Sequence, residues 1–256
     1  MKSLDTPCRV CGKESEPLFS ELVLKKYQVQ YYQCTSCEYV QTENPYWLDE
    51  AYGEAIKYSD VGLLNRNLIC MKKTLSWLYL FNNPKGRFLD YAGGLGIFTR
   101  LMRDQGIDFY HNDPYAENIF AHKHSAELQG QFEAIAMFEC FEHWVEPTKE
   151  IELLFKHTNT LIFSTGVVGK NPSPSWDYFG FPHGQHVGIA SRKAIEYLAK
   201  KLDKQYYHDG FFHILTDKKN SALKLWGWRK MGQSILFMFL RRRQRTLLYQ
   251  DVKKYQ

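Results

Sequence analysis

Apolar and polar residues alternate in blocks along the central part of the chain, and these blocks predict an α/β fold. Apolar runs predict strands at 87–91, 107–112, 132–138 and 160–164. Helical periodicity predicts helices at 47–57, 61–81, 96–105 and 148–157. Strands that alternate with helices in this way form a parallel sheet that is covered by helices on both faces.

The pattern changes after a long loop. Segment 191–202, SRKAIEYLAKKL, predicts a capped helix. Two β-rich runs between residues 205 and 216 then surround Asp209-Gly210, a pair that is typical of a tight hairpin. The pattern therefore predicts a parallel sheet that finishes in an antiparallel hairpin.

Four cysteines form two pairs with the spacing of zinc ligands. The pairs are Cys8-x-x-Cys11 and Cys34-x-x-Cys37, and the 22 residues between them have the pattern of short strands. Two such pairs place four thiolates tetrahedrally around one zinc ion. The alternative, two disulfides, is disfavoured in a reducing cytosol. We therefore predict a small N-terminal zinc ribbon. Its four cysteines leave no open coordination position on the zinc ion, so we expect the metal to be structural.

Composition excludes several classes of protein. Of the 256 residues, 44% are hydrophobic and 16% aromatic, which is enough to fill a folded core. The net charge of +5 is well short of that of a polycationic nucleic-acid binder. The chain shows no secretory signal pattern and no apolar run of the ~20 residues that span a bilayer, so we expect a cytoplasmic protein. Cys70 and Cys140 are expected to be buried thiols.

A turn of small residues follows the first predicted strand of the sheet. It has the form Asp90-x-Ala92-x-Gly94-x-Gly96 and leads directly into a helix. Such a turn places main-chain N–H groups against a ligand, although many glycine turns are only tight turns. The next strand ends at Asp113, where a carboxylate is placed to bind the two hydroxyls of a ribose. We therefore expect a nucleoside-like ligand.

The segments LDYAGGLG, HNDP and AMFECFEHWVEP resemble the successive motifs of class I S-adenosylmethionine-dependent methyltransferases. The family has glycine where this chain has Ala92, and an alanine still permits the same close approach if its φ is negative. The resemblance implies a Rossmann-like, seven-stranded sheet with an antiparallel last strand. It also implies that S-adenosylmethionine binds with Asp113 at its ribose and with Met137 and Phe138 beside its adenine or methionine end. Arg66 is expected to bind the methionine carboxylate, with a surface salt bridge as the alternative.

Further segments resemble a narrower group. A four-cysteine ribbon followed by YWLDEAYGEAI, DVGLLNRN and HGQHVGIASRKAIEYLA is similar to bacterial methyltransferases of surface-polysaccharide pathways and to zinc-ribbon methyltransferases of nucleotide-linked deoxysugars. This resemblance implies methylation of a sugar hydroxyl in a polysaccharide, glycolipid or nucleotide-sugar pathway, with C-methylation as an alternative. An RNA methyltransferase and a non-catalytic S-adenosylmethionine-binding scaffold are the competing functions. Nucleic acid is disfavoured because glutamates match the lysines of the ribbon.

Methyl transfer to a hydroxyl requires alignment and is helped by a general base. His143, which follows Glu142, is the first candidate, and His186, which shares the segment HGQH with His183, is the second. Loop capping and exposure to solvent are the alternatives. Glu139, Glu142 and His143 also match the Glu-x-x-Glu-His arrangement of ubiquinone-pathway O-methyltransferases, which implies a divalent cation such as magnesium or manganese. A hydrogen-bond network is the alternative.

The predicted regions of the chain are 1–45, the zinc ribbon; 46–220, the methyltransferase domain with its leading helices; and 221–256, a basic amphipathic tail. The tail combines Trp226 and Trp228 with the apolar run 235–240 and four arginines in 241–245. This composition suits a peripheral contact with anionic lipid at the inner face of a membrane, and hence a lipid-linked glycan acceptor in place of a small molecule. The alternative is a helix that packs on the sheet or on a partner subunit.

Overall fold

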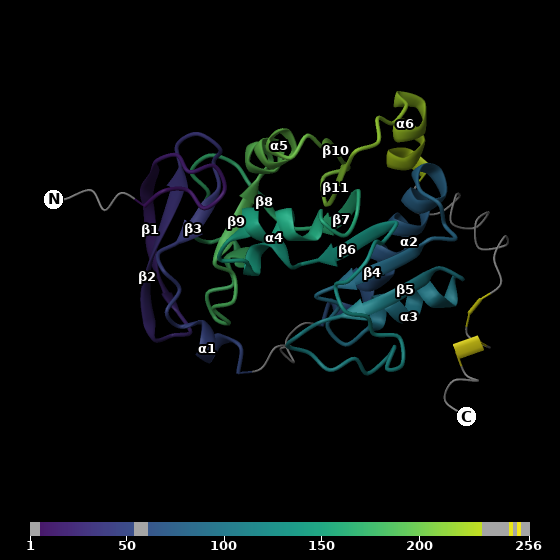
Figure 1. The fold of residues 1–256 in the computed structure, drawn as a ribbon. Helices are drawn as coiled ribbons and strands as arrows, with labels where there is room; N and C mark the ends of the chain where they lie inside the picture. Colours follow the sequence, from purple (N-terminus) through teal and green to yellow (C-terminus); the bar gives the residue numbers. More distant parts are fainter. Residues whose placement is uncertain (1–5, 54–60, 232–245, 248–249, 252–256) are drawn as a thin grey trace. The chain divides into compact units, whose positions relative to one another are not determined.

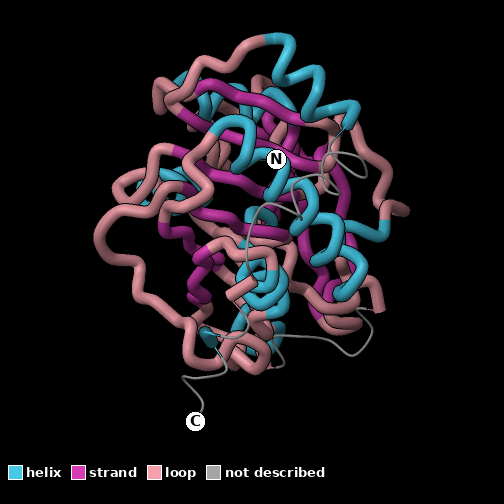
Figure 2. Tube along the Cα trace, turned by 90° about the vertical axis from the view of Figure 1, so that its right-hand side faces the viewer, coloured by secondary structure: helices cyan, strands magenta, loops and turns pink. Residues whose placement is uncertain are grey.

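The computed structural model describes residues 6–53, 61–231, 246–247 and 250–251. The chain forms two compact units, each of which combines strands with helices (Figure 1). The first unit consists of residues 1–55, 139–153 and 164–215, and the second consists of 56–138, 154–163 and 216–256. Figure 2 distinguishes the strands, in magenta, from the helices, in cyan.

The first unit is built on a five-stranded sheet with the order β1-β2-β3-β9-β8. β1 (Ser15–Val23) and β2 (Tyr27–Cys34) form an antiparallel hairpin between the two cysteine pairs. β3 (Val40–Thr42) pairs in antiparallel fashion with β2 and with β9 (Gly188–Ser191), and β9 pairs in parallel with β8 (Val167–Val168). The N-terminal hairpin is therefore continuous with strands from the second half of the chain.

Apolar residues of this sheet share one core. Val29 and Tyr31 of β2 are buried, and they belong to the same cluster as Trp47, Phe179 and Ile189. The rings of Tyr31 and Phe179 meet edge to face, with centroids 5.8 Å apart. Burial of such large aromatic side chains stabilises the unit through the apolar area that they remove from water.

Short helices and a hairpin complete the first unit. Their bounds are α1 Leu48–Ala51, α4 Pro147–Leu154, α5 Arg192–Lys201, β10 Gln205–His208 and β11 Phe212–Thr216. α5 begins where the sequence predicts, because the Ser191 hydroxyl accepts a hydrogen bond from the Ala194 N–H at 2.9 Å. α1 ends earlier than the predicted helix 47–57, whose last residues lie outside the described part of the chain.

The second unit contains the four predicted strands of the parallel sheet. They are β4 (Arg87–Tyr91), β5 (Asp108–Asn112), β6 (Ala134–Phe138) and β7 (Thr160–Ser164), in the order β7-β6-β4-β5. β4 pairs in parallel with both β5 and β6. Phe88 and Leu89 of β4 are fully buried, as expected for a strand with both faces covered.

Helices α2 (Leu63–Phe81) and α3 (Ile97–Asp104) pack together in the second unit, and α3 also packs against β5. The apolar residues of α2 are buried mainly in the second half of the helix. Its first half exposes Leu64 and Leu68 by 62% and 41%, respectively, whereas Leu75 is buried.

A further strand that a seven-stranded sheet would have beside β5 is reduced to a single bridge. His111 and Ser125 form an isolated parallel bridge. The His111 N–H donates to the His124 carbonyl at 2.7 Å, and the Ala126 N–H donates to the His111 carbonyl at 2.9 Å. Residues 113–130 form turns and loops around this bridge in place of a helix followed by a strand. The count of seven strands with an antiparallel last strand stays a prediction.

The C-terminal region differs from the predicted membrane tail. α6 (Ala222–Met231) exposes Trp226 by 59%, but Trp228 is only 2% exposed and contacts Trp77 of α2. The prediction that both tryptophans lie at a lipid boundary is therefore wrong for Trp228. The apolar and arginine runs at 235–245 lie outside the described residues. Among the helices that are described, none is both long and apolar enough to cross a membrane.

Candidate functional site

The small-residue turn after β4 adopts a left-handed backbone. Ala92, Gly94 and Gly96 have φ values of 56°, 56° and 80°. The condition set from the sequence for a close approach at Ala92, a negative φ, is not met, and the left-handed conformation costs an alanine about 1 kcal/mol. Gly93, which sequence reasoning missed, is needed because a Cβ there would lie 2.6 Å from Oδ2 of Asp90. The signal for it was its place as the second small residue of the Ala92-Gly93-Gly94 run.

Asp90 is buried next to this turn, beside Gly93. Its side chain is 2% exposed, and its Oδ2 accepts a hydrogen bond from the Thr99 hydroxyl at 2.8 Å. Burial raises the pKa of Asp90 to about 7, well above the usual value for a carboxyl. The Asp90 side chain therefore packs against Gly93 of the turn and binds Thr99 of α3, and its carboxylate is not presented at the surface.

Asp113 organises the loop after β5. Its Oδ2 accepts from the Gly94 N–H at 2.8 Å, and its Oδ1 accepts from the N–H groups of Tyr115 and Ala116 at 2.8 and 2.9 Å. The ring of His111 donates from Nε2 to the Gly94 carbonyl at 2.8 Å. The peptide groups on both sides of Gly94 are thus fixed by the end of β5.

A cavity of about 360 Å³ opens beside this loop and is lined by residues from 111 to 127. Asp113, Asn118, Ser125 and Glu127 contribute polar atoms to its wall. The volume is that of a small-molecule pocket, and the Asp113 carboxylate, which accepts one N–H on Oδ2 and two on Oδ1, keeps a lone pair on Oδ2 for a ribose hydroxyl. The residues of the cavity therefore fit a nucleoside. Sequence reasoning found Asp113 and missed the other three, which lie in a stretch without regular periodicity.

Three other predicted cofactor residues also lie in the second unit. Met137 is fully buried in β6. Phe138 at the end of β6 is half-buried and meets Phe98 edge to face, with centroids 4.8 Å apart. Arg66 is half-buried in the first turn of α2. Of these three, only Phe138 and Arg66 have solvent-accessible surface.

The predicted catalytic residues form a cluster in the first unit. Ligand-type atoms of Glu142, His143 and His186 all lie within 4.8 Å of one another. Glu142 and His143 lie in a 3-10 turn (Phe141–His143), and His186 comes from the loop before β9. The structure thus brings His186 to the place that the Glu-x-x-Glu-His pattern gives to Glu139. Glu139 instead accepts hydrogen bonds from the hydroxyls of Ser164 and Tyr178 at 2.6 and 3.2 Å.

Glu142 is the buried acid of this cluster. Its side chain is fully buried, and it accepts hydrogen bonds from the Tyr178 hydroxyl at 2.5 Å and the Thr165 hydroxyl at 2.9 Å. Burial and the charge of Glu142 raise the pKa of Tyr178 well above its usual value, so the phenol remains a donor. Tyr178 and Thr165 were not predicted from sequence, because the chain folds back to Glu142 only in three dimensions.

Main-chain contacts fix the tautomers of two histidines. The Tyr178 carbonyl accepts a hydrogen bond from Nδ1 of His186 at 2.5 Å, so the lone pair of neutral His186 is on Nε2. Nδ1 of His183 accepts from the Gln185 N–H at 3.1 Å, so neutral His183 carries its proton on Nε2. The ring centroid of His186 lies 4.7 Å from that of His183 and 4.9 Å from that of His143.

Burial keeps the two candidate bases neutral. It lowers the pKa of His186 and lowers the pKa of His143 well below its usual value, with a further decrease at His143 from the neighbouring His186 and His183. Nδ1 of His143 lies 3.2 Å from the Tyr52 hydroxyl. Because only a neutral imidazole accepts a proton, both residues have the protonation state of a general base near pH 7.

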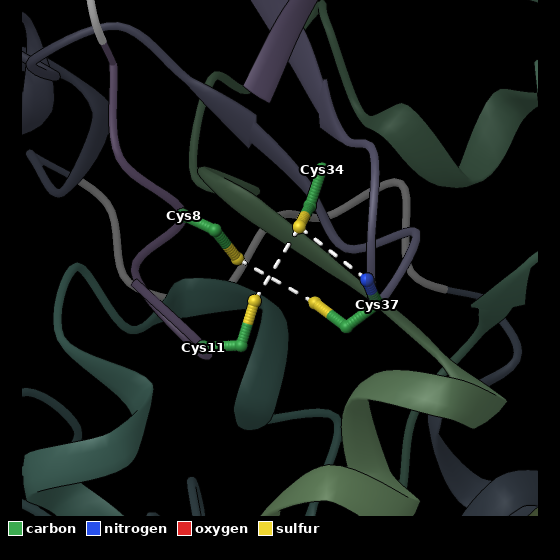
Figure 3. A group of neighbouring side chains, drawn as sticks. All are labelled: Cys8, Cys11, Cys34 and Cys37. Carbon is green, nitrogen blue, oxygen red and sulfur yellow. Dashed lines mark hydrogen bonds between the residues drawn. The ribbon is translucent and has the colours of Figure 1, made fainter. Parts of the chain in front are cut away.

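The four paired cysteines converge at the base of the β1–β2 hairpin (Figure 3). The Sγ atoms of Cys8 and Cys37 lie 3.5 Å apart, those of Cys11 and Cys34 lie 3.4 Å apart, and all four lie within 4.8 Å of one another. These separations are longer than the roughly 2.05 Å of a disulfide bond, and the four cysteines are free thiols in the structure. The hydrogen bond with Cys37 lowers the pKa of Cys8 to about 6. Four converging sulfur ligands fit one tetrahedral zinc ion.

The pattern that defines a family described as "Methyltransferase domain" matches residues 66–208, more than half of the chain. No curated protein sequence matches the chain. Its fold is similar to that of several solved methyltransferases at low sequence identity. Magnesium protoporphyrin IX methyltransferase from Synechocystis PCC 6803, with bound SAH, is 14% identical over 66% of this chain and 90% of that chain, with a TM-score of 0.47.

Two other solved structures have similar scores. A possible histamine N-methyltransferase from Thermotoga maritima is 13% identical over 68% of this chain and 97% of that chain, with a TM-score of 0.44. Human N-acetylserotonin methyltransferase in complex with SAM is 10% identical over 68% of this chain and 66% of that chain, with a TM-score of 0.42.

Proposed function

Because this chain belongs to the methyltransferase-domain family and is a class I S-adenosylmethionine-dependent methyltransferase, we propose that it methylates a hydroxyl group of a sugar, with His186 as the general base. The observation that carries the choice of base is the hydrogen bond from Nδ1 of His186 to the Tyr178 carbonyl, which leaves a lone pair on Nε2. The sugar acceptor is supported by the order of sequence segments from the cysteine pairs to HGQH.

The residues of the second unit would hold the cofactor. S-adenosylmethionine, when bound, supplies an electrophilic methyl group on a positively charged sulfur. Asp113 would accept hydrogen bonds from the ribose hydroxyls, and the main-chain groups of the turn at Ala92–Gly96 would face the methionine portion. Asp90, buried below the turn, would keep that backbone in place. Phe138 and Arg66 remain the candidates for the adenine or methionine end.

The residues around His186 would handle the acceptor and its proton. Transfer of the methyl group to the acceptor oxygen would break the sulfur–methyl bond and leave S-adenosylhomocysteine. Nε2 of His186 would accept the proton of the acceptor hydroxyl and later release it to water. The carboxylate of Glu142, whose oxygen lies within 4.8 Å of the His186 nitrogen, would stabilise this positive charge. His143 would contact the acceptor from the other side of the cluster, held by the Tyr52 hydroxyl.

A divalent cation in the same cluster is the second candidate, and the convergence of Glu142, His143 and His186 favours it. Two imidazoles and one carboxylate suit a transition-metal ion better than magnesium. The histidines would then be ligands and not bases. Metal analysis decides between the two, because a cysteine centre alone gives one zinc per chain, whereas a second site adds a metal that His186→Ala removes.

The proposal is tested with labelled S-adenosylmethionine and a panel of nucleotide sugars and lipid-linked saccharides, with total RNA as the competing acceptor. We expect label in a sugar fraction. Replacement of His186 by Ala should lower the rate about 10²- to 10⁴-fold, whereas the exposed His122 changed to Ala should leave it unaltered. Label in RNA alone would support the RNA alternative and reject the sugar. Cofactor binding without transfer to any acceptor would support the non-catalytic scaffold.

A further inference from the structure

We infer that Arg9, which lies inside the first cysteine pair, is a positioning residue that ties the cysteine centre to His186. The inference rests on the proposed function, because it concerns the geometry of the proposed base. All the residues in it belong to the first unit. It gives the cysteine centre a role in acceptor chemistry although none of its four sulfurs lies in the histidine cluster.

The main chain around Cys8 is clamped by one buried amide. The Arg9 N–H donates to Oε1 of Gln41 at 2.8 Å, and Nε2 of Gln41 donates to the Pro7 carbonyl at 3.0 Å. Gln41 lies in β3 opposite Gly188 of β9 and is only 1% exposed. Gln41 therefore holds the first cysteine pair in a fixed position relative to β9, the strand that follows His186.

The guanidinium of Arg9 binds main-chain carbonyls at the end of β3 and in the segment just before β9. Its Nη2 donates to the carbonyls of Thr42 and Glu43 at 2.7 and 2.8 Å, and its Nη1 donates to the Val187 carbonyl at 3.2 Å. Hydrogen bonds from a charged donor are stronger than those between neutral groups. One side chain thus joins the first cysteine pair, the end of β3 and the residue after His186.

Val187 is the link to the catalytic cluster. It is fully buried, and its carbonyl also accepts from the Thr42 N–H at 3.1 Å. Its own N–H donates to the Glu142 carbonyl at 2.9 Å. This N–H belongs to the peptide that joins His186 to Val187, so the bond sets the position of His186 relative to Glu142. Arg9 holds the opposite side of Val187 and thereby stabilises that position.

The second cysteine pair holds the other end of the same segment. The Ser191 hydroxyl donates to the Cys37 carbonyl, and the same hydroxyl caps α5. Residues 187–191 are thus attached to the first pair through Arg9 and to the second pair through Cys37. We therefore expect loss of the metal to release the backbone that carries His186.

The test compares Arg9→Met, which keeps the aliphatic volume and removes the donors, with the wild type. The matched control is Lys26→Met in the same unit, where an exposed lysine pairs with Glu50 at 2.7 Å. The readouts are the tautomer of His186 by long-range ¹H–¹⁵N NMR, metal per chain, and S-adenosylmethionine affinity by calorimetry. The His186 signals are assigned with His186→Asn. None of these measurements requires the acceptor.

We expect Arg9→Met to retain the metal and to bind S-adenosylmethionine within about twofold of the wild type, because the cofactor residues are independent of Arg9. Its His186 should lose the single Nδ1–H tautomer and become an exchanging mixture, whereas Lys26→Met should leave the tautomer unchanged. If Arg9→Met loses the metal, the test uses Arg9→Lys instead. In that variant we expect the Nδ1–H tautomer of His186 to be partly lost.

An unchanged His186 tautomer in a metal-loaded Arg9→Met or Arg9→Lys protein would overturn the inference. Chelation of the wild-type metal gives an independent outcome, since the inference requires the His186 signals to change with metal loss. If they stay as in the loaded protein, the link to the cysteine centre is rejected. Failure of all variants and the wild type to bind S-adenosylmethionine would instead count against the proposed function.

Discussion

The indole rings of Trp77 and Trp228 meet edge to face, with centroids 5.1 Å apart and an interplanar angle of 78°. Trp77 lies on α2 and Trp228 on α6, and both are buried. Offset and edge-to-face pairs of aromatic rings add to the stabilisation that comes from burial. The contact makes α6 part of the core of the second unit.

Removal of the Trp228 ring should therefore destabilise the second unit. We expect Trp228→Ala to lower the free energy of unfolding by about 3–5 kcal/mol, because truncation leaves a cavity against Trp77. Trp226→Ala, on the exposed side of the same helix, should change it by less than about 0.5 kcal/mol. Urea denaturation followed by circular dichroism measures both. Equal effects of the two substitutions would contradict the assignment of Trp228 to the core.

Asp113 should control cofactor affinity. Replacement by Ala removes a carboxylate that would bind the ribose and also frees the N–H groups of Gly94, Tyr115 and Ala116. We expect binding of S-adenosylmethionine to weaken by about 2–3 kcal/mol, which calorimetry measures directly. Asp113→Asn keeps one acceptor oxygen and should lose less. Affinity that is unchanged in the alanine variant would exclude Asp113 from the cofactor site.

One zinc ion should be bound per chain through the four paired cysteines. We expect Cys34→Ser to abolish the zinc and to disorder the β1–β2 hairpin, because metal-binding energy in such a site is folding energy. Cys70→Ala, at a buried thiol in the second unit, is the control and should keep the zinc. Elemental analysis of protein purified without chelator gives the stoichiometry, and a metal-free wild type would refute the assignment.

The buried Asp90 should make stability depend on pH in an unusual direction. Its pKa of about 7 in the folded protein is above the usual 3.8, so between these values the folded state holds a proton that the unfolded state releases. This carboxyl therefore contributes stability below pH 4 that is lost as the pH rises through 7. The loss is at most about 1.4 kcal/mol for each pH unit.

Asp90→Asn should remove this pH dependence of stability. We expect the variant to gain stability relative to the wild type as the pH rises from 4 to 7, and to show no relative gain below pH 4. Denaturant titrations of both proteins across this range give the difference directly, so that other titrating groups cancel. A difference that is constant with pH would show that Asp90 titrates at its ordinary pKa.

Local patterns were sufficient to predict most elements of the fold. β4 and β7 have the predicted bounds because each is a short apolar run between clear turns. The cysteine pairs were predictable because a spacing of two residues already sets where two sulfurs point. The place of Asp113 directly after a strand was predictable because β5 is a short apolar run that ends at Asn112, whereas its role at a ribose stays a prediction. In each case the determining contacts lie within a few residues along the chain.

The composition of the histidine cluster was not predictable in full. The local Glu-x-x-Glu-His pattern favours Glu139, but its carboxylate turns to Ser164 and Tyr178, and His186 approaches Glu142 from 44 positions further along the chain. A long loop carries no periodicity that reports such an approach. The φ of Ala92 was also missed, because tertiary contacts at the turn override the preference of an alanine for negative φ.

The single bridge between His111 and Ser125 also bears on solubility. β5 is the last strand of its sheet, and an open strand edge recruits strands from other molecules. Here the outward N–H and carbonyl of His111 are already occupied by His124 and Ala126, so the five-residue strand offers little to a passing chain. The loop at 113–130 therefore covers this strand edge in addition to lining the pocket. Insertions that pull this loop away from β5 would expose the main-chain N–H and carbonyl of His111 and would favour self-association as the protein concentration rises.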